Sequence, residues 1–279
     1  MSAWLPVAPC TPRECAHHEG ARRPPAYAVA LLTAGCALTL LGVLCVPAVL
    51  LLGPAHRDLL IRRWARAVVR AFGVRVRVTG QPVERARPPA GELVVANHVS
   101  WLDIPLVASV LPARMVAKSE IRNWPLLGPL AALGGTLFIE RDRLRALPHT
   151  VGALAGALAS GARVAVFPQG STWCGRSGGG PFRPAAFQAA IDAGSAVRPV
   201  RITYRTPAAD AAGAAAFVGD DPLAASLWRV VTAAGLTAEI RILPPVHADG
   251  APGRRALARA AQSAVASDSA NLPAASVHH

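Results

Sequence analysis

Residues 93–103 read Leu-Val-Val-Ala-Asn-His-Val-Ser-Trp-Leu-Asp. The unbroken apolar run at the start predicts a short strand buried in a sheet, and the polar residues after it predict a loop at the strand's end. His98 and Asp103 belong to that loop. On a regular helix their side chains would point about 140° apart, so only a tight turn brings imidazole and carboxylate together. Such a pair can act as a general base and the group that orients it.

Around this stretch, short apolar runs alternate with helical patterns. This alternation is typical of an α/β sandwich, in which helices flank a mostly parallel twisted sheet. Ligands in such folds bind beyond the carboxyl ends of strands, where residues 97–103 fall. Strands are predicted at Val74–Val78, Leu93–Ala96, Arg114–Ala117, Thr136–Ile139, Arg163–Phe167, Arg198–Tyr204 and Glu239–Leu243. Helices are predicted near residues 102–110, 124–133, 144–160, 184–193, 222–235 and 253–266.

The composition restricts the classes of partner. Hydrophobic residues make up 52% of the chain, which points to a membrane-associated segment. The net charge of +13 suits anionic lipid, phosphorylated substrates or nucleic acid. The basic residues do not alternate with aromatic ones, however, and a bilayer anchor argues against nucleic acid. We therefore expect membrane lipid and no nucleic acid among the partners.

An uncharged segment, Tyr27–Gly53, is about as long as a helix needs to cross a bilayer. Pro47 near its end favours either a kink or a re-entrant hairpin. Residues 57–72 then form a basic amphipathic pattern, which suits a helix at the surface of an anionic membrane or an ordinary surface helix with solvated arginines. The distribution of arginines places the following body on the cytoplasmic side of the cell membrane.

The five cysteines contain no C-x-x-C pair and are odd in number, so we expect neither a disulfide framework nor a metal site. Cys174 is interpreted as a small packing residue.

The segment Asn97-His98-x-x-x-x-Asp103 resembles the first signature motif of the glycerolipid acyltransferases, the lysophosphatidic acid acyltransferase family. Three further motifs of that family follow in the expected order. Residues 135–141 read Gly-Thr-Leu-Phe-Ile-Glu-Arg, residues 167–171 read Phe-Pro-Gln-Gly-Ser, and residues 197–200 read Val-Arg-Pro-Val. The family pattern has glutamate at the place of Gln169 and usually threonine at the place of Ser171.

The resemblance implies a membrane-bound enzyme that moves a fatty acyl group from acyl-CoA or acyl-carrier protein to the hydroxyl of a lysophospholipid. The expected acceptor is 1-acyl-sn-glycerol-3-phosphate and the product phosphatidic acid, with no cofactor and no metal. By the same resemblance His98 and Asp103 are catalytic, and the substrate-binding residues are Asn97, Arg141, Gln169, Gly170 and Ser171. Gln169 keeps two alternatives open, namely an acceptor such as lyso-ornithine lipid, or a non-catalytic lipid-binding protein.

Four regions are expected along the chain. Residues 1–26 form a flexible tail, and residues 27–72 form the membrane anchor with the basic amphipathic helix. Residues 73–250 form the acyltransferase domain, and residues 251–279 form a C-terminal helix and tail.

Overall fold

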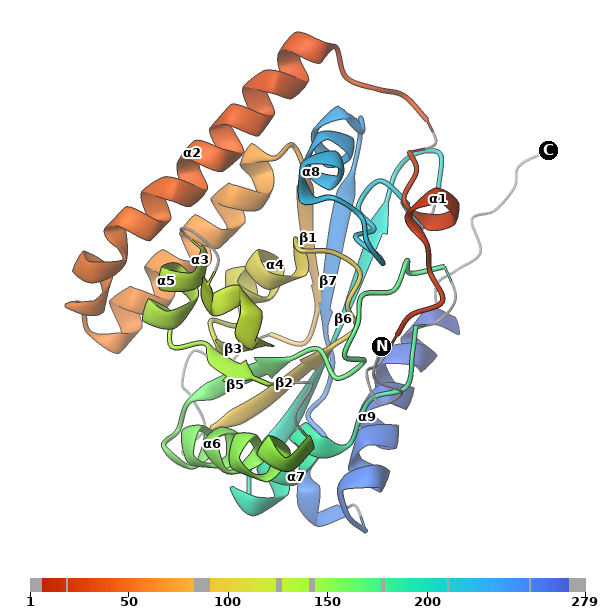
Figure 1. Cartoon of the computed structure of the whole chain (residues 1–279). Helices are drawn as coiled ribbons and strands as arrows, with labels where there is room; N and C mark the ends of the chain where they lie inside the picture. The colour runs from red at the N-terminus through yellow and green to blue at the C-terminus, as the bar shows by residue number, and fades with distance from the viewer. Residues whose placement is uncertain are drawn as a thin grey trace.

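The structure of the chain is a computed structural model that describes residues 7–18, 20–82, 91–123, 127–140, 144–176, 179–209, 211–250 and 252–270. Its centre is a sheet with the strand order β1-β7-β6-β2-β5-β3-β4 (Figure 1). The strands are β1 (Arg75–Gly80), β2 (Glu92–Ala96), β3 (Arg114–Lys118), β4 (Leu137–Ile139), β5 (Arg163–Val166), β6 (Ala196–Arg205) and β7 (Thr237–Ile242). The pair β6–β7 is antiparallel and the other described pairs are parallel. The predicted mostly parallel sheet is confirmed.

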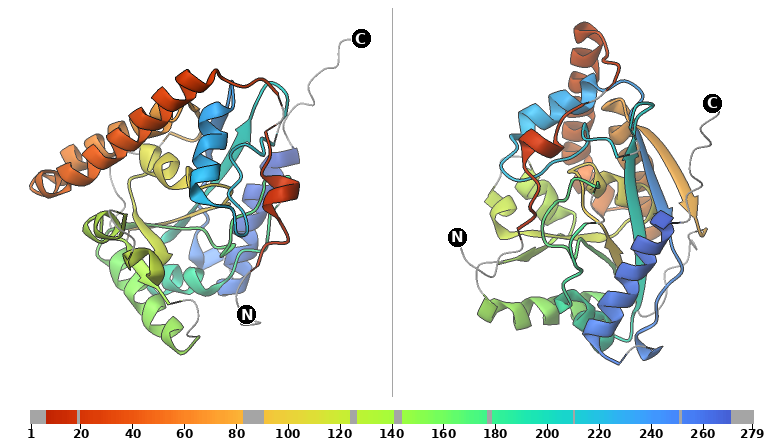
Figure 2. Two further views of the ribbon diagram at one scale, coloured as in Figure 1. Left: turned by 45° about the horizontal axis from the view of Figure 1, so that its top comes forward. Right: turned by 90° about the vertical axis from the view of Figure 1, so that its right-hand side faces the viewer.

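Helices cover both faces of the sheet (Figure 2). They are α1 (Pro12–Cys15), α2 (Pro25–Leu50), α3 (Pro54–Ala71), α4 (Asp103–Val110), α5 (Leu127–Leu133), α6 (Leu147–Ala159), α7 (Ala185–Asp192), α8 (Leu223–Thr232) and α9 (Arg254–Ala270). Each helix expected in the body lies within a few residues of its predicted range. The periodicity of apolar residues therefore located the helices correctly.

The sheet separates two hydrophobic cores, and strand β2 contributes side chains to both. Val94 and Ala96 face a core that includes residues of α3, α4 and α8, whereas Leu93 and Val95 face a core built with α6, α7 and α9. All four side chains are buried. Because alternate residues of a strand point to opposite faces, a strand buried on both sides needs an unbroken apolar run, as this one has.

Helices α2 and α3 form an antiparallel hairpin along one side of the molecule (Figure 1). Helix α2 runs through Pro47 without a break, and the chain reverses after Leu50. Gly42 lies against the Trp64 indole, whose Nε1–H donates to the Leu38 carbonyl at 3.0 Å. A side chain at Gly42 would overlap that ring, so a small residue is needed for this close helix packing.

The expected boundary between anchor and body at residue 72 does not coincide with the packing. Ala28 from α2 and Val68, Val69 and Phe72 at the end of α3 are buried in the same core as the sheet. The hairpin is therefore part of the folded body at one end, while leucines farther along α2, such as Leu41 and Leu44, are exposed.

The described part of residues 1–26, the region expected to form a flexible tail, packs against the body. Cys10 and Ala16 are buried in a small apolar cluster with Ala216 and Val218. Arg23 donates hydrogen bonds to the carbonyls of Val231 and Gly73. A segment rich in proline and histidine becomes ordered here because the body supplies partners for its polar groups.

Candidate active site

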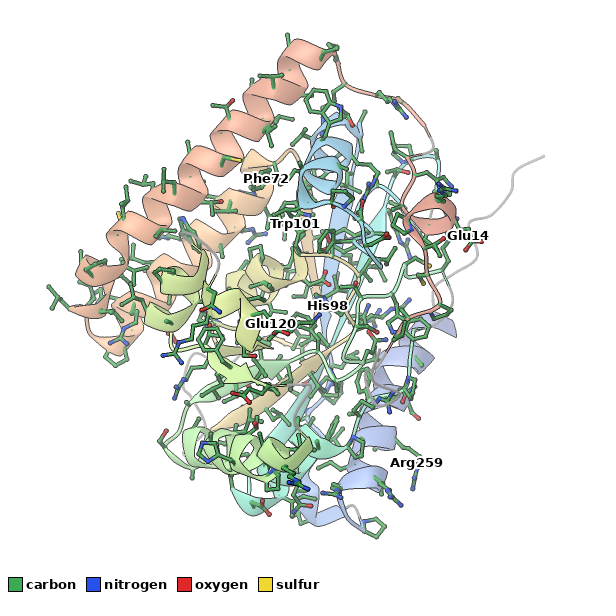
Figure 3. All side chains as sticks on the ribbon, in the orientation of Figure 1. Glu14, Phe72, His98, Trp101, Glu120 and Arg259 are labelled. Atoms are coloured by element: carbon green, nitrogen blue, oxygen red, sulfur yellow. The ribbon has the colours of Figure 1, made fainter. Side chains whose placement is uncertain are left out.

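The candidate site lies at the carboxyl edge of the sheet, between β2 and β5. The two strands are parallel neighbours, with Leu93 opposite Val164 and Val95 opposite Val166. Their carboxyl ends therefore open side by side, which brings residues 97–103 next to residues 167–171. The His98 imidazole stacks on the Phe167 ring with 4.1 Å between ring centroids and 14° between planes. His98 lies near the middle of the molecule (Figure 3).

Asp103 begins helix α4 and is fully buried. Its Oδ2 accepts hydrogen bonds from the backbone N–H groups of Val99 and Ser100 at 2.7 and 2.9 Å. The same oxygen bonds His98 Nδ1 at 2.8 Å, and Oδ1 accepts from the Tyr204 hydroxyl at 2.6 Å. A buried carboxyl surrounded by donors on both oxygens is held as the acceptor-only carboxylate. The turn over residues 99–101 thus forms around this one charge.

This hydrogen-bond network also fixes the tautomer of His98. Because Asp103 accepts, Nδ1 carries the proton, and Nε2 keeps its lone pair free to take one. The His98 side chain is 20% exposed, whereas Asp103 is closed off from solvent. The predicted turn, and not a regular helix, brings the two residues together, since the described helix starts only at Asp103. The pair has the geometry of a general base and its orienting carboxylate.

Gln169 supports His98 from the other loop. Its side chain is buried, and its Oε1 accepts from the His98 backbone N–H at 2.7 Å. Its Nε2 donates to the Gly180 carbonyl at 3.4 Å. Both ends of the amide thus bond to the protein, which gives Gln169 a role in positioning His98, and its predicted contact with substrate stays a prediction.

Asn97 has a similar role. Its Nδ2 donates to the Ile202 carbonyl and its Oδ1 accepts from the Ile202 N–H, both at 2.8 Å. This pair of bonds joins the end of β2 to β6. Asn97 therefore has a structural role, and its predicted contact with substrate stays a prediction.

Gly170 and Ser171 complete the second loop. Gly170 has φ = +77°, a left-handed conformation that glycine adopts without steric cost, and its N–H donates to the Phe167 carbonyl. The Ser171 Oγ is shielded from solvent and has no hydrogen-bond partner among the described residues. A buried hydroxyl without a partner suits contact with a substrate polar group, so Ser171 stays a predicted substrate-binding residue.

Arg141 lies outside the described residues. Strand β4, which ends at Ile139, is parallel to β3 and so opens toward the same edge of the sheet as β2. Its predicted role in binding phosphate stays a prediction.

Sequence reasoning missed two residues that build the site. Tyr204 holds Asp103 from strand β6, and Trp101 packs edge-to-face on Phe72 with 5.1 Å between centroids. Figure 3 shows Trp101 and Phe72 together, between the candidate site and the α2–α3 hairpin. Burial and the nearby Asp103 charge raise the pKa of Tyr204 well above its ordinary value, so its hydroxyl stays a donor. The only sequence signal for Tyr204 was its place at the end of a predicted strand.

The fold and the site define the class of protein, namely an α/β enzyme with an oriented histidine base at the carboxyl edge of its sheet. Comparison with known proteins gives the family. Residues 75–203 match the sequence profile of the family described as Acyltransferase.

Two relatives match this chain over most of their own length. The lyso-ornithine lipid O-acyltransferase of Pseudomonas aeruginosa is 39% identical over 211 residues, which is 75% of this chain and 78% of the relative. The 1-acyl-sn-glycerol-3-phosphate acyltransferase of Neisseria meningitidis is 35% identical over 204 residues, or 73% of this chain and 78% of the relative.

Among solved structures, the 1-acyl-sn-glycerophosphate acyltransferase PlsC from Thermotoga maritima has the same fold. The TM-score is 0.65 at 18% identity, and the match covers 87% of this chain and 93% of that one. The chain belongs to the acyltransferase family, as the resemblance implied, and it is an acyltransferase of lipid metabolism.

Proposed function

We propose that the enzyme transfers a fatty acyl group from a thioester to the hydroxyl of a lysolipid, with His98 as the general base. The observation that carries this proposal is the buried Asp103 carboxylate that binds His98 Nδ1 and so presents Nε2 to the substrate. In this mechanism Nε2 removes the hydroxyl proton while the oxygen attacks the thioester carbonyl carbon. The carbon–sulfur bond then breaks, and the departing thiolate takes the proton from the imidazolium.

The proposed acceptor is 1-acyl-sn-glycerol-3-phosphate, and the product is then phosphatidic acid. Support comes from the motif at residues 135–141, with Arg141 as the predicted phosphate ligand, and from the similarity to the Neisseria meningitidis enzyme. A guanidinium can bind phosphate through two parallel hydrogen bonds.

A second candidate acceptor is a lyso-ornithine lipid. The specific observation that favours it is the 39% identity to the Pseudomonas aeruginosa enzyme, which is higher than the 35% identity to the Neisseria meningitidis enzyme. Ornithine brings amino and carboxyl groups in place of a phosphate, so the two acceptors make different demands on Arg141. The acyl donor that we propose is acyl-CoA or acyl-carrier protein, both of which are anionic and suit a basic chain.

We also propose that the α2–α3 hairpin holds the enzyme on the membrane. Helix α2 is long and apolar enough to cross a bilayer by length and composition, and it exposes Leu40, Leu41, Leu44 and Leu50. Helix α3 runs back along it and carries Arg57, Arg62, Arg63, Arg66 and Arg70. Charged side chains are costly in the bilayer centre, so the pairing favours a hairpin in one leaflet over a full crossing. Positive flanking residues favour the cytoplasmic side.

The test is an acylation assay with purified full-length enzyme. Lysophosphatidic acid and lyso-ornithine lipid are offered separately, each with acyl-CoA and with acyl-carrier protein, and products are identified by mass. The His98→Ala variant is the control, and we expect it to lose about 10²–10⁴-fold in turnover while melting as the wild type does. Near-normal turnover in the folded variant would contradict the mechanism, and acylation of only the ornithine lipid would replace the first acceptor by the second.

A further inference from the structure

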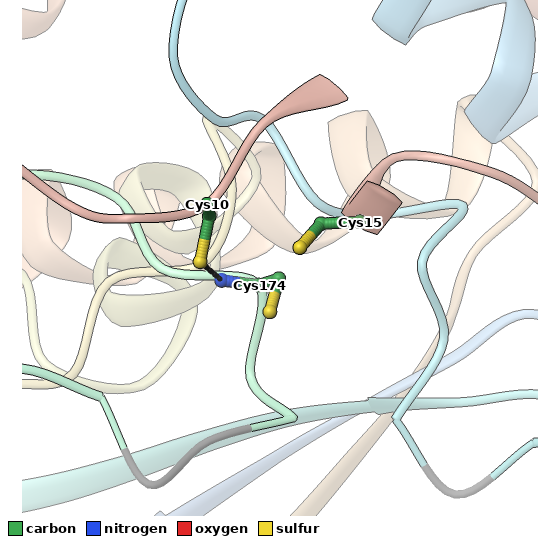
Figure 4. A group of neighbouring side chains, drawn as sticks. All are labelled: Cys10, Cys15 and Cys174. Carbon is green, nitrogen blue, oxygen red and sulfur yellow. Dashed lines mark hydrogen bonds between the residues drawn. The ribbon is translucent and has the colours of Figure 1, made fainter. Parts of the chain in front are cut away.

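Two cysteines near the N-terminus meet a third from the body of the protein in a mostly buried cluster next to the second active-site loop. Cys10 and Cys15 come from the N-terminal segment, and Cys174 follows the second active-site loop (Figure 4). Their sulfur atoms all lie within 4.8 Å of one another. The other two cysteines, Cys36 and Cys45, are exposed on helix α2. Every cysteine outside the apolar helix thus takes part in the cluster.

The local fold explains how Cys10 and Cys15 come together. The Thr11 hydroxyl oxygen accepts from the Glu14 N–H, and Pro12 starts the single helical turn α1. The Cys15 N–H then donates to the Thr11 carbonyl. A capped turn of this kind reverses the chain over five residues, so that both thiols face Cys174 of the body.

We propose that Cys10, Cys15 and Cys174 form a three-thiolate site for one soft closed-shell metal ion, Zn²⁺ or Cu⁺. Thiolates are the ligands that these ions prefer. With metal–sulfur bonds of about 2.3 Å, sulfurs on one ion lie roughly 3.8–4.0 Å apart. The observed separations, all within 4.8 Å, are close to that value.

The surroundings of the thiols suit a metal site better than simple packing. The Cys174 N–H donates to the Cys10 sulfur at 3.5 Å, which stabilises negative charge on that sulfur. Cys10 and Cys174 are buried against Ala216 and Val218, an apolar shell that limits access of water. Among the described residues no further His, Cys, Asp or Glu ligand atom joins the group. The partly exposed Cys15 leaves room for a water molecule as a fourth ligand.

Bound metal would tie the N-terminal segment to the catalytic loop. The Trp173 N–H donates to the His98 carbonyl at 2.8 Å, and Cys174 is the next residue. The site therefore joins residues 10–15 to the backbone that carries the proposed base, at a distance of one peptide unit from it.

The test measures metal content, so its outcome is independent of acyl transfer. The reduced full-length protein is dialysed against Zn²⁺ or against Cu⁺ without oxygen, and bound metal is counted. Co²⁺ serves as a spectroscopic probe for thiolate ligation. We expect one ion per chain, and we expect Cys15→Ser to weaken binding by more than about tenfold, since loss even of an outer partner of a ligand costs 10–100-fold. The Cys36→Ser/Cys45→Ser control should bind as the wild type does.

Because Cys10 and Cys174 are buried, a melting curve first shows whether their serine variants fold. Cys15 is only partly buried, so Cys15→Ser should disturb folding least. Hydrogen exchange of residues 7–18 gives a second readout, and Zn²⁺ should slow it in the wild type and in the Cys36→Ser/Cys45→Ser control but not in the cluster variants. A reduced protein that retains no ion, or a triple Cys10/Cys15/Cys174→Ser variant that retains as much as the wild type, would overturn the proposal. A disulfide between two of the thiols in freshly isolated protein, with no metal binding after reduction, would do the same.

Discussion

At the scale of single residues, Gln169 shows how a departure from a family pattern can leave the local structure intact. The family's glutamate and this glutamine both offer an oxygen at the place where Gln169 Oε1 accepts from the His98 N–H. The amide differs by adding a donor, and that donor points to the Gly180 carbonyl. The change of residue is thus compatible with a complete site, which weighs against the alternative of a non-catalytic protein.

We predict that Gln169→Leu lowers turnover by about tenfold or more, whereas Gln169→Glu retains most of it. Leucine leaves the buried His98 N–H without an acceptor, at a cost of roughly 1–3 kcal/mol, and glutamate keeps the acceptor. Turnover on the preferred lysolipid, measured beside a melting curve, checks this. Equal activity of the leucine and glutamate variants would show that the hydrogen bond does not position His98.

Tyr204→Phe is expected to reduce turnover and to lower the melting temperature. The change removes a hydrogen bond from the Tyr204 hydroxyl to Asp103 Oδ1, and hydrogen bonds to charged groups contribute about 1.5–3 kcal/mol. The effect should fall on kcat more than on the KM for either substrate, because Tyr204 acts through Asp103. The other tyrosine of the chain is the exposed Tyr27, so Tyr27→Phe is a matched control that should change neither quantity.

At the scale of elements, helix α3 has two roles. Its apolar residues Val68, Val69 and Phe72 pack into the core, and Phe72 contacts Trp101 of the catalytic loop. Its arginines lie along the hairpin that we propose to bind the membrane surface. An element that joins the lipid surface to the catalytic loop can place the acceptor hydroxyl near His98.

We predict that reversing two exposed charges of α3, in Arg63→Glu/Arg70→Glu, weakens binding to anionic vesicles by at least about tenfold at low salt. Each basic residue near an anionic surface contributes about 1 kcal/mol, and salt screens the attraction. Sedimentation with vesicles at low and high salt measures the effect. The variant Arg255→Glu/Arg259→Glu on α9 changes the charge equally, on exposed positions of another helix. If both variants lose the same affinity, net charge and not α3 holds the protein on the membrane.

At the scale of the whole molecule, a buried ion network joins three strands at the end of the sheet away from the candidate site. Glu92 at the start of β2 accepts from Arg163 of β5 at 2.9 Å and from Arg198 of β6 at 2.7 Å. Glu92 and Arg163 are both buried. This network joins strands whose opposite ends carry the loops of the candidate site. The stabilising ion pairs and the candidate site therefore lie at opposite ends of the same strands.

Glu92→Gln should therefore destabilise the fold by about 3–5 kcal/mol, since it leaves two arginines without their charge partner. The kcat of the protein that stays folded should remain near the wild-type value. Denaturant unfolding and turnover at low temperature measure the two effects. Glu239→Gln, at a partly exposed carboxylate that accepts from Thr79, serves as the control and should cost less than about 1 kcal/mol. A fall in kcat as large as the loss of stability would show that the network also shapes the site.

The sequence by itself determined the strand positions, the mostly parallel sheet and the His98–Asp103 pair. These features are local, because the period of apolar residues reports which side of a strand or helix is buried. It also determined the family, through four short motifs in order. The role of each residue within those motifs depends on contacts with distant segments, which the motifs do not show. Asn97 and Gln169, for example, were assigned to substrate but form hydrogen bonds to the protein itself.

Only the tertiary structure decided which distant residues meet. Tyr204 reaches Asp103 across 101 positions, Gln169 reaches His98 across 71, and Cys174 reaches Cys10 across 164. These contacts depend on the strand order, which places β2 between β5 and β6. The residue pattern within a single segment does not predict that order. The three clustered cysteines form no short motif in the sequence for this reason, because Cys174 reaches Cys10 and Cys15 only in the folded chain. The physical limit is the same in each case: local patterns report exposure to solvent, whereas a site is defined by packing between elements.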